Sequence, residues 1–185
     1  NAEVGMADLA DCSVCPLGTY APLASMQCYD CQSGKYSDKL RVESCRDCST
    51  GRYQPNTKQT QCIGCPQGKY SPASGGSDQS ICARCPEGTY SHSLGAAACI
   101  KCPVGRAGTA TSATDSSTCK LCEEGTYADT DGSPRCNKCP ADTYSSILGS
   151  NAGSDCKACP VGKTSVPGST HCTFPCQAGQ YSSAL

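Results

Sequence analysis

Residues 62–70 read CIGCPQGKY, and the two cysteines at the start of this stretch, separated by two residues, decide the fold. The same CxxC spacing occurs in zinc knuckles, in redox-active dithiols and at the junction between two disulfide-closed loops. Each possibility leads to a different protein: an intracellular adaptor, an oxidoreductase or an extracellular scaffold. The composition of the chain and the repetition of the motif distinguish among them.

The chain has 185 residues and 20 cysteines, a content typical of secreted scaffolds that are held together by disulfides. Leu, Ile, Val and Phe together supply only 19 residues. An ordinary domain has at least about twice that fraction of large apolar side chains, because their burial offsets the chain entropy lost on folding. Covalent bonds or metal ions must therefore replace much of the hydrophobic core, and the composition favours an extracellular location.

The charge and hydropathy of the chain exclude two kinds of partner. The 15 Lys and Arg residues are balanced by 16 Asp and Glu residues, giving a net charge of −1, and they are scattered without a cationic stripe. Binding to nucleic acid needs such a stripe, and a membrane span needs about 20 apolar residues in a row. We therefore expect neither nucleic acid nor a membrane span in this segment. The expected partners are other proteins, including copies of the chain itself, with no small-molecule substrate and no cofactor.

The CxxC motif repeats along nearly the whole chain. Successive pairs are 16, 17, 17, 20, 17, 20, 17, 20 and 16 residues apart, and the last pair has one extra spacer. The pairs are Cys12/Cys15, Cys28/Cys31, Cys45/Cys48, Cys62/Cys65, Cys82/Cys85, Cys99/Cys102, Cys119/Cys122, Cys136/Cys139, Cys156/Cys159 and Cys172/Cys176. Such a period predicts a tandem array of repeats over residues 12–181, with residues 1–11 before it and residues 182–185 after it. Because the chain begins at Asn1 and has no signal peptide, we expect a mature segment or a piece of a longer protein.

Each repeat has further fixed positions, counted from the second cysteine of its pair. Pro often comes next, and Gly stands at the third position in every repeat except the one that has Asp142. Gly there indicates a positive φ or a close backbone approach, and Asp is among the residues that tolerate the same conformation. Tyr stands at the fifth position of eight repeats, where we expect it to cover a disulfide or the neighbouring hairpin: Tyr20, Tyr36, Tyr53, Tyr70, Tyr90, Tyr127, Tyr144 and Tyr181.

Between the Tyr and the next cysteine pair lie turn-forming residues, for example SPASGGSDQS at 71–80. A short extended piece, a turn rich in Gly, Ser, Asp and Pro, and a return piece predict a small two-stranded hairpin. No window is long enough for an ordinary helix without containing paired cysteines. The predicted fold class is an elongated tandem array of small disulfide-rich repeats, made of short β-hairpins with little regular structure and no helices.

Two readings of the paired cysteines other than disulfides remain. Two neighbouring CxxC pairs match the spacing of a zinc ribbon, although ten pairs would then bind five ions and the intervening segments lack the surface with which such knuckles bind partners. A thioredoxin-like dithiol needs its first cysteine at the start of a helix, which the pattern does not supply. Disulfides explain the repetition with fewer assumptions.

Two disulfide arrangements are compatible with the spacing. In one, pairs interlock as first to third and second to fourth cysteine, giving Cys12–Cys28 with Cys15–Cys31. In the other, which we favour because the Gly and Tyr positions recur in every repeat, the second cysteine of each pair bonds the first of the next. Cys12 and Cys176 then remain unpaired or bond to flanking chain or a neighbouring molecule. The favoured bonds are Cys15–Cys28, Cys31–Cys45, Cys48–Cys62, Cys65–Cys82, Cys85–Cys99, Cys102–Cys119, Cys122–Cys136, Cys139–Cys156 and Cys159–Cys172.

The stretches CPLGTY, CPQGKYS and CPEGTYS, at residues 15–20, 65–71 and 85–91, resemble the ephrin-receptor-like cysteine-rich repeats of extracellular modular proteins. The opening of a tumour necrosis factor receptor module is more distantly similar. The resemblance implies an extracellular, rod-like array without enzyme activity, and it specifies no ligand. Some repeats depart from the pattern, lacking either the Pro or the aromatic residue: Gln32, Ser49, Glu123, Gln177, Ala107 and Thr164.

The monotony of the repeats favours a structural or adhesive function, as a spacer or filament-forming segment of a larger surface or secreted protein. A receptor ectodomain that binds a protein ligand is the second hypothesis, and it would need an exposed aromatic or Arg cluster. Tyr29 and the stretch DKLRVESCRD at 38–47 are the candidates for such a cluster.

We find no catalytic constellation and no metal site in the sequence. His92 and His171 lie on separate loops, without a nucleophile or paired carboxylates nearby in the pattern. The stretch DTDGS at 129–133 has two of the carboxylates of a calcium loop, but a closing Glu is missing, so we interpret it as a turn.

Overall fold

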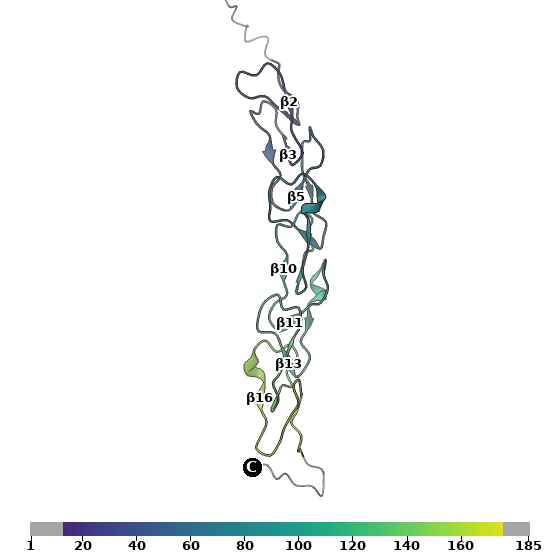
Figure 1. Cartoon of the computed structure of the whole chain (residues 1–185), viewed down its shortest axis with the longest axis vertical. Coiled ribbons are helices and arrows are strands. Elements are labelled where there is room, and N and C mark those ends of the chain that lie inside the picture. The colour runs from purple at the N-terminus through teal and green to yellow at the C-terminus, as the bar shows by residue number, and fades with distance from the viewer. Residues whose placement is uncertain (1–12, 176–185) are drawn as a thin grey trace, which may run out of the picture. The chain divides into compact units, whose positions relative to one another are not determined.

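The computed structural model describes residues 13–175, and Figure 1 shows that regular structure in this part is limited to very short strands and single turns. It contains no α-helix in these residues. The strands are β1 (Thr19–Tyr20), β2 (Tyr29–Asp30), β3 (Lys35–Tyr36), β4 (Arg46–Asp47), β5 (Arg52–Tyr53), β6 (Ile63–Gly64), β7 (Lys69–Tyr70), β8 (Ala83–Arg84), β9 (Thr89–Tyr90), β10 (Ile100–Lys101), β11 (Arg106–Ala107), β12 (Lys120–Leu121), β13 (Thr126–Tyr127), β14 (Asn137–Lys138), β15 (Thr143–Tyr144) and β16 (Lys157–Ala158).

Each odd-numbered strand pairs with the strand that follows it, so the sheets are successive two-stranded hairpins. In the first hairpin, Thr19 lies opposite Asp30 and Tyr20 opposite Tyr29 in antiparallel register. The first strand of each hairpin contains the position of the conserved spacing that is usually Tyr, and the second strand lies between the two cysteines of the next pair. The predicted fold class, a disulfide-rich tandem array of short β-hairpins, is confirmed.

A disulfide closes each hairpin loop at its base. The second cysteine of one pair bonds the first cysteine of the next pair, with Cα–Cα distances between 5.5 and 5.8 Å. This is the geometry of an ordinary disulfide, and the pairing is that of the neighbouring-loop arrangement. Cys12 and Cys176 lie outside the described residues.

The three longer steps of the repeat have a common structural cause. In each, a single 3₁₀ turn stands directly before the first cysteine of the next pair: η2 (Gln79–Ile81), η3 (Ser116–Thr118) and η4 (Gly153–Asp155). Asp78 and Asp115 cap the first two of these turns by accepting a hydrogen bond from the backbone N–H of Ser80 and Ser117. The added residues therefore lengthen the loop without disturbing its base.

The chain divides into two compact units, each composed of several segments. The first unit comprises residues 1–65, 71–83 and 95–97, and the second comprises residues 66–70, 84–94 and 98–185. The same repeating contacts build both units. The extent of the array, residues 12–181, with flanking segments 1–11 and 182–185, stays a prediction from the sequence.

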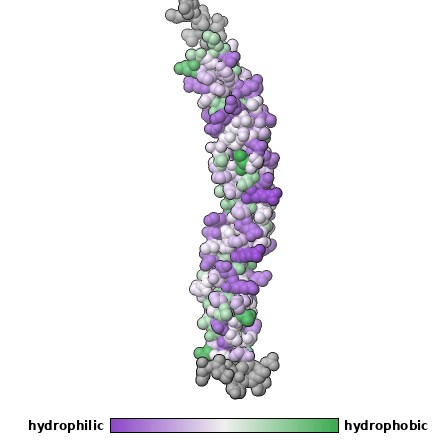
Figure 2. All heavy atoms as spheres, in the orientation of Figure 1, coloured by the Kyte–Doolittle hydropathy of each residue, from purple (hydrophilic) through white to green (hydrophobic). Residues whose placement is uncertain are grey.

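The buried residues are mainly cysteines and small polar residues rather than large apolar ones. Fully buried side chains include Cys31, Cys48, Cys65 and Ser71, and in the first unit Tyr53 packs with Cys65, Cys82 and Ile81. Figure 2 shows a face on which hydrophilic and neutral residues predominate and hydrophobic ones are scattered. Disulfides thus occupy the space that large apolar side chains fill in an ordinary domain.

Candidate functional site

The residues that could suggest catalysis or metal binding are not brought together. His92 packs beside Tyr90, with ring centroids 6.2 Å apart, and His171 contacts the hydroxyl of Thr170. Within residues 13–175, no three His, Cys, Asp or Glu side chains converge as metal ligands. Asp131 of the calcium-like stretch instead accepts a hydrogen bond from the N–H of Val104 at 3.1 Å. Its carboxylate therefore fastens a turn to another loop.

The feature that recurs throughout the described chain is the Gly at the third position after each cysteine pair. These glycines have positive φ, between 74° and 83°, and Asp142 takes their place with a φ of 61°. Each N–H donates to a carbonyl just after the first strand of the next hairpin, as from Gly18 to Ser37 at 2.9 Å and from Gly105 to Ala128 at 2.8 Å. The prediction of positive φ at this position is confirmed, and the backbone conformation aims the N–H at the next repeat.

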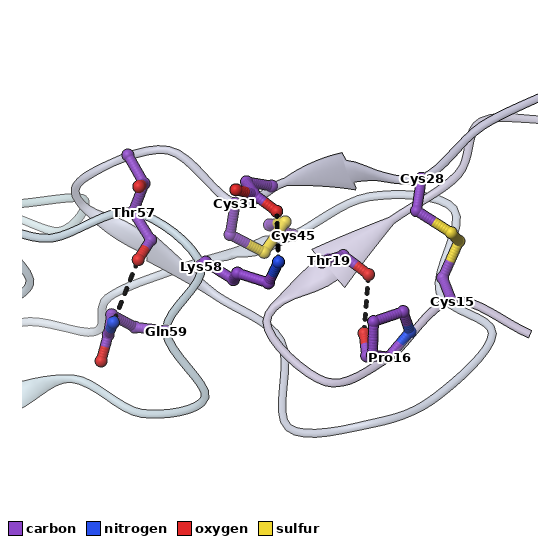
Figure 3. A network of polar contacts seen from close by, with 10 residues as sticks. Cys15, Pro16, Thr19, Cys28, Cys31, Cys45, Thr57, Lys58 and Gln59 are labelled. Carbon is purple, nitrogen blue, oxygen red and sulfur yellow. Dashed lines mark hydrogen bonds and ion pairs between the residues drawn. A yellow bond between two sulfur atoms is a disulfide. The ribbon is translucent and has the colours of Figure 1, made fainter.

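A second backbone contact fastens the tip of each loop to a cysteine of an earlier repeat. In the first unit, the N–H of Lys58 donates to the carbonyl of Cys31 at 2.7 Å (Figure 3), and Gly75 donates in the same way to Cys48. In the second unit, Gly132 donates to Cys102 and Gly149 donates to Cys122. The loop is therefore fixed at both ends, by a disulfide at its base and by a hydrogen bond at its tip.

The same loop tip also lies against a Gly of the repeat before that cysteine. A Cβ built on Gly18 would lie 2.4 Å from the carbonyl oxygen of Lys58, and one built on Gly88 would lie 2.1 Å from that of Gly132. We call this arrangement a glycine socket: a positive-φ Gly whose Cα receives the carbonyl of a loop tip that starts two cysteine pairs later. The sockets in the described residues involve Gly18, Gly34, Gly51, Gly68, Gly88, Gly105 and Gly125.

The sequence predicted the glycines of the sockets but not the loop tips that fill them. Every tip has positive φ, yet several are not Gly, namely Lys58 with φ 59° and Ser112 with φ 57°. A sequence signal was present in the tips that are Gly: Gly75, Gly95, Gly132, Gly149 and Gly168. The non-Gly tips hid this second period. The contacts consequently extend beyond the adjacent repeat.

The candidate ligand-binding residues lie on the first unit. Tyr29 stacks at a tilt beside Tyr20, with 5.8 Å between ring centroids, and is 42% exposed. In the stretch 38–47, Asp38 pairs with Arg46 at 3.7 Å, and Asp47 pairs with Lys35 at 2.6 Å. These charges are largely compensated by neighbours in the same unit, which leaves Tyr29 as the exposed aromatic of the region.

The structure also locates the predicted Tyr residues of the repeats. Tyr53 is buried against a disulfide, whereas Tyr20, Tyr36, Tyr70, Tyr90, Tyr127 and Tyr144 are half-buried. Ala107, which replaces the aromatic residue, is also buried. Tyr181 lies outside the described residues.

The largest hollow among the described residues is an open groove in the first unit, with a volume of about 440 Å³. Val14, Leu23, Ala24, Arg41 and Val42 contribute to its lining. It contains one cation and one carboxylate, from Arg41 and Glu43, and no His. This combination suits a protein surface better than a reaction centre.

Comparison with protein families assigns the repeats. The profile of the family described as tyrosine-protein kinase ephrin type A/B receptor-like matches three overlapping segments, residues 34–82, 73–119 and 108–156. No curated protein matches the chain. In residues 13–175 there is no helix with the length and apolarity needed to cross a bilayer. Receptor-like repeats of this kind, combined with a disulfide in every loop, point to an extracellular or cell-surface location. The chain belongs to the ephrin-receptor-like family of cysteine-rich repeats.

Proposed function

We propose that this chain is a non-catalytic structural module of a larger surface or secreted protein, and that it acts as a stapled spacer between the parts it connects. The observation that supports this proposal most directly is the double fastening of each loop. The loop closed by Cys122–Cys136, for example, is tied at its tip to the carbonyl of Cys102. A loop held at base and tip cannot swing independently of the earlier repeats.

Fastening of this kind resists bending because it is distributed along the chain. In solenoid arrays, stability is a sum of repeat and interface contributions, so that every added repeat extends the structure without a new core. Here the interface between repeats is made of backbone hydrogen bonds of 2.6–3.3 Å from the socket position and of 2.7–2.9 Å from the loop tip. Backbone contacts tolerate changes of side chain, which fits a module selected for length and stiffness.

The chemistry of the surface supports the same function. Among the described residues, exposed apolar side chains are scattered, and the three salt bridges, such as Lys58–Asp30 at 3.4 Å, are exposed. The open groove presents no group with the reactivity of a nucleophile or general base. We therefore propose that the chain has no enzyme activity and no small-molecule substrate.

A receptor function is the second candidate, and the exposure of Tyr29 favours it. Tyr and Arg are over-represented among residues that dominate binding energy at protein interfaces. Tyr29 on β2 and Arg46 on β4 are both exposed in the first unit. A protein ligand that used this surface would lose affinity when Tyr29 is replaced by Ala and keep it when the half-buried Tyr90 is replaced.

Small-angle X-ray scattering of the oxidised chain tests the spacer function. A compact protein of this length would have a radius of gyration of about 16 Å, and a spacer should clearly exceed that value. We expect the profile to be insensitive to salt and to a chelator, and to change to that of an unfolded chain after reduction. A radius near the compact value, or an oxidised chain as expanded as the reduced one, would contradict the proposal.

A further inference from the structure

The glycine socket is a self-complementary device, because the same repeat that offers a socket to a later loop offers its own loop tip to an earlier socket. Gly18 follows the first cysteine pair, and the loop that fills its socket starts at the third pair, Cys45/Cys48. In the second unit, Gly125 follows the seventh pair and contacts Gly168, in the loop that starts at the ninth pair. Each socket therefore takes the loop that starts two pairs later.

Near the end of the described residues, Gly162 has the backbone conformation of a socket but no occupant. Its φ is 83°, and no described atom lies within 4 Å of a Cβ built on it. The glycines of the filled sockets are buried, whereas Gly162 is exposed. The preceding residue shows the same difference, since Val161 of CPVG is fully exposed while Val104, in the same tetrapeptide farther up the chain, is 41% exposed.

At the start of the described residues, the opposite half of the contact is present. Ala24 and Arg41 lie at the tips of the first two loops and have φ values of 62° and 59°, like Lys58 and Ser112, whose carbonyls fill sockets. None of the described glycines has the carbonyl of Ala24 or Arg41 within 4 Å of its Cβ position. A positive φ is unfavourable for residues with a side chain, so the fold holds these tips in the docking conformation before anything is docked.

We propose that this chain self-associates head to tail, with the Ala24 loop tip of one copy filling the Gly162 socket of the next. This inference rests on the proposed structural function and specifies its partner as a second copy of the chain. The register follows from counting: Gly162 follows the ninth pair, the tenth pair is Cys172/Cys176, and the eleventh is the first pair of the second copy. The loop that starts at that pair is Cys15–Cys28, which contains Ala24.

Apolar side chains beside the two contact points add to the association. Leu23 precedes Ala24 and is 88% exposed, and Val161 precedes Gly162. Burial of such side chains contributes free energy in proportion to the apolar area removed from water. The contact is heterologous, because the two copies use different surfaces, so it does not close on itself and generates open filaments.

Sedimentation velocity over a range of concentrations tests the proposal on the oxidised chain. The wild-type chain should form species that grow with concentration, and negative-stain images should show copies joined end to end. Gly162→Asp should weaken this association by at least about tenfold, because a Cβ at a filled socket lies only 2.1–2.4 Å from the incoming carbonyl. Asp142 shows that Asp is accommodated at this position of the repeat with positive φ.

Two matched controls separate docking from general effects of charge. Ser146→Asp introduces the same charge at an exposed position within an internal loop and should associate like the wild type. If Gly162→Asp perturbs folding, Val161→Asp replaces a fully exposed side chain and should weaken association as well, whereas Leu94→Asp, at another exposed apolar residue, should not.

A wild-type chain that stays monomeric up to about 1 mM, the range of the weakest specific complexes, would overturn the proposal. So would association that both socket variants leave unchanged, or images of copies joined side by side. None of these results affects the spacer function, which depends on the scattering of the monomer. A compact monomer would instead overturn the spacer function alone.

Discussion

The backbone N–H of Gly132 donates to the carbonyl of Cys102 at 2.8 Å, while the carbonyl of Gly132 lies against Gly88. One peptide turn thus contacts two earlier repeats through its two polar groups. A hydrogen bond to a backbone carbonyl contributes about 1 kcal/mol, and here it also brings the chain close enough to exclude any side chain from Gly88.

The two roles of the socket Gly, positive φ and close approach, can be separated by comparing Gly88→Ala with Gly162→Ala. Both changes place Ala at a φ near 80°, which costs about 1 kcal/mol or slightly more. Only Gly88→Ala also forces a Cβ to within 2.1 Å of a carbonyl oxygen, so we expect a further loss of about 2 kcal/mol or more. Denaturant unfolding of the monomer, with disulfides intact, measures the difference. Equal losses would mean that the close approach is unimportant.

Tryptic digestion without reduction should report the disulfide arrangement. Lys120 lies between Cys119 and Cys122, so cleavage there separates the two loops. The arrangement in the structure predicts that peptide 102–106 is linked to 107–120, and that 121–135 is linked to 136–138. The interlocked arrangement would instead link 107–120 to 136–138, and mass spectrometry distinguishes these products. A zinc-binding chain would give free thiols and would lose its structure in a chelator.

Tyr53 should contribute more to stability than the Tyr residues at equivalent positions. It is 8% exposed and packs against Cys65 and Cys82, while Tyr36 is half-buried. Truncation of a buried aromatic side chain costs about 3–5 kcal/mol in a core, and we expect Tyr53→Ala to fall near the lower end of that range because the cluster is small. Tyr36→Ala is the matched control and should cost clearly less. Thermal unfolding followed by circular dichroism measures both.

The cap of the 3₁₀ turn η3 should make stability depend on pH in acid. Hydrogen bonds from the side chain and backbone N–H of Ser117 hold the pKa of Asp115 below its ordinary value of 3.8, with Lys120 adding a smaller effect in the same direction. Because the folded pKa is lower than the unfolded one, the stabilisation is present above pH 3.8 and is lost as the pH falls through the folded pKa.

Replacement of Asp115 by Ser tests this pH dependence, since a Ser hydroxyl can still cap the turn but does not titrate in acid. We expect the difference in melting temperature between wild type and Asp115→Ser to shrink on acidification. NMR titration of the Asp115 carboxyl group gives the direction of the pKa shift independently. A pKa at or above the ordinary value would show that the cap does not form in solution.

The recurrence of paired cysteines, Gly and Tyr made the hairpin array predictable, because these positions have few physical alternatives. A chain with 20 cysteines and so few large apolar residues cannot fold around an ordinary core, and Gly at a fixed position in nearly every repeat indicates a backbone constraint. The longer steps were also predicted to lengthen only the loop, and they do so by inserting 3₁₀ turns such as η3.

The sequence by itself determined the hairpins, their loop lengths and the family, because each depends on spacing between residues in or next to one repeat. Only the tertiary structure decided which distant repeats touch. The socket contact joins Gly88 to Gly132, and equivalent tips are as different as Lys58 and Ser112, so no single residue type marks the contact. The reason is that the contact is made by backbone groups, whose positions are set by φ and by the closing disulfides rather than by side-chain identity.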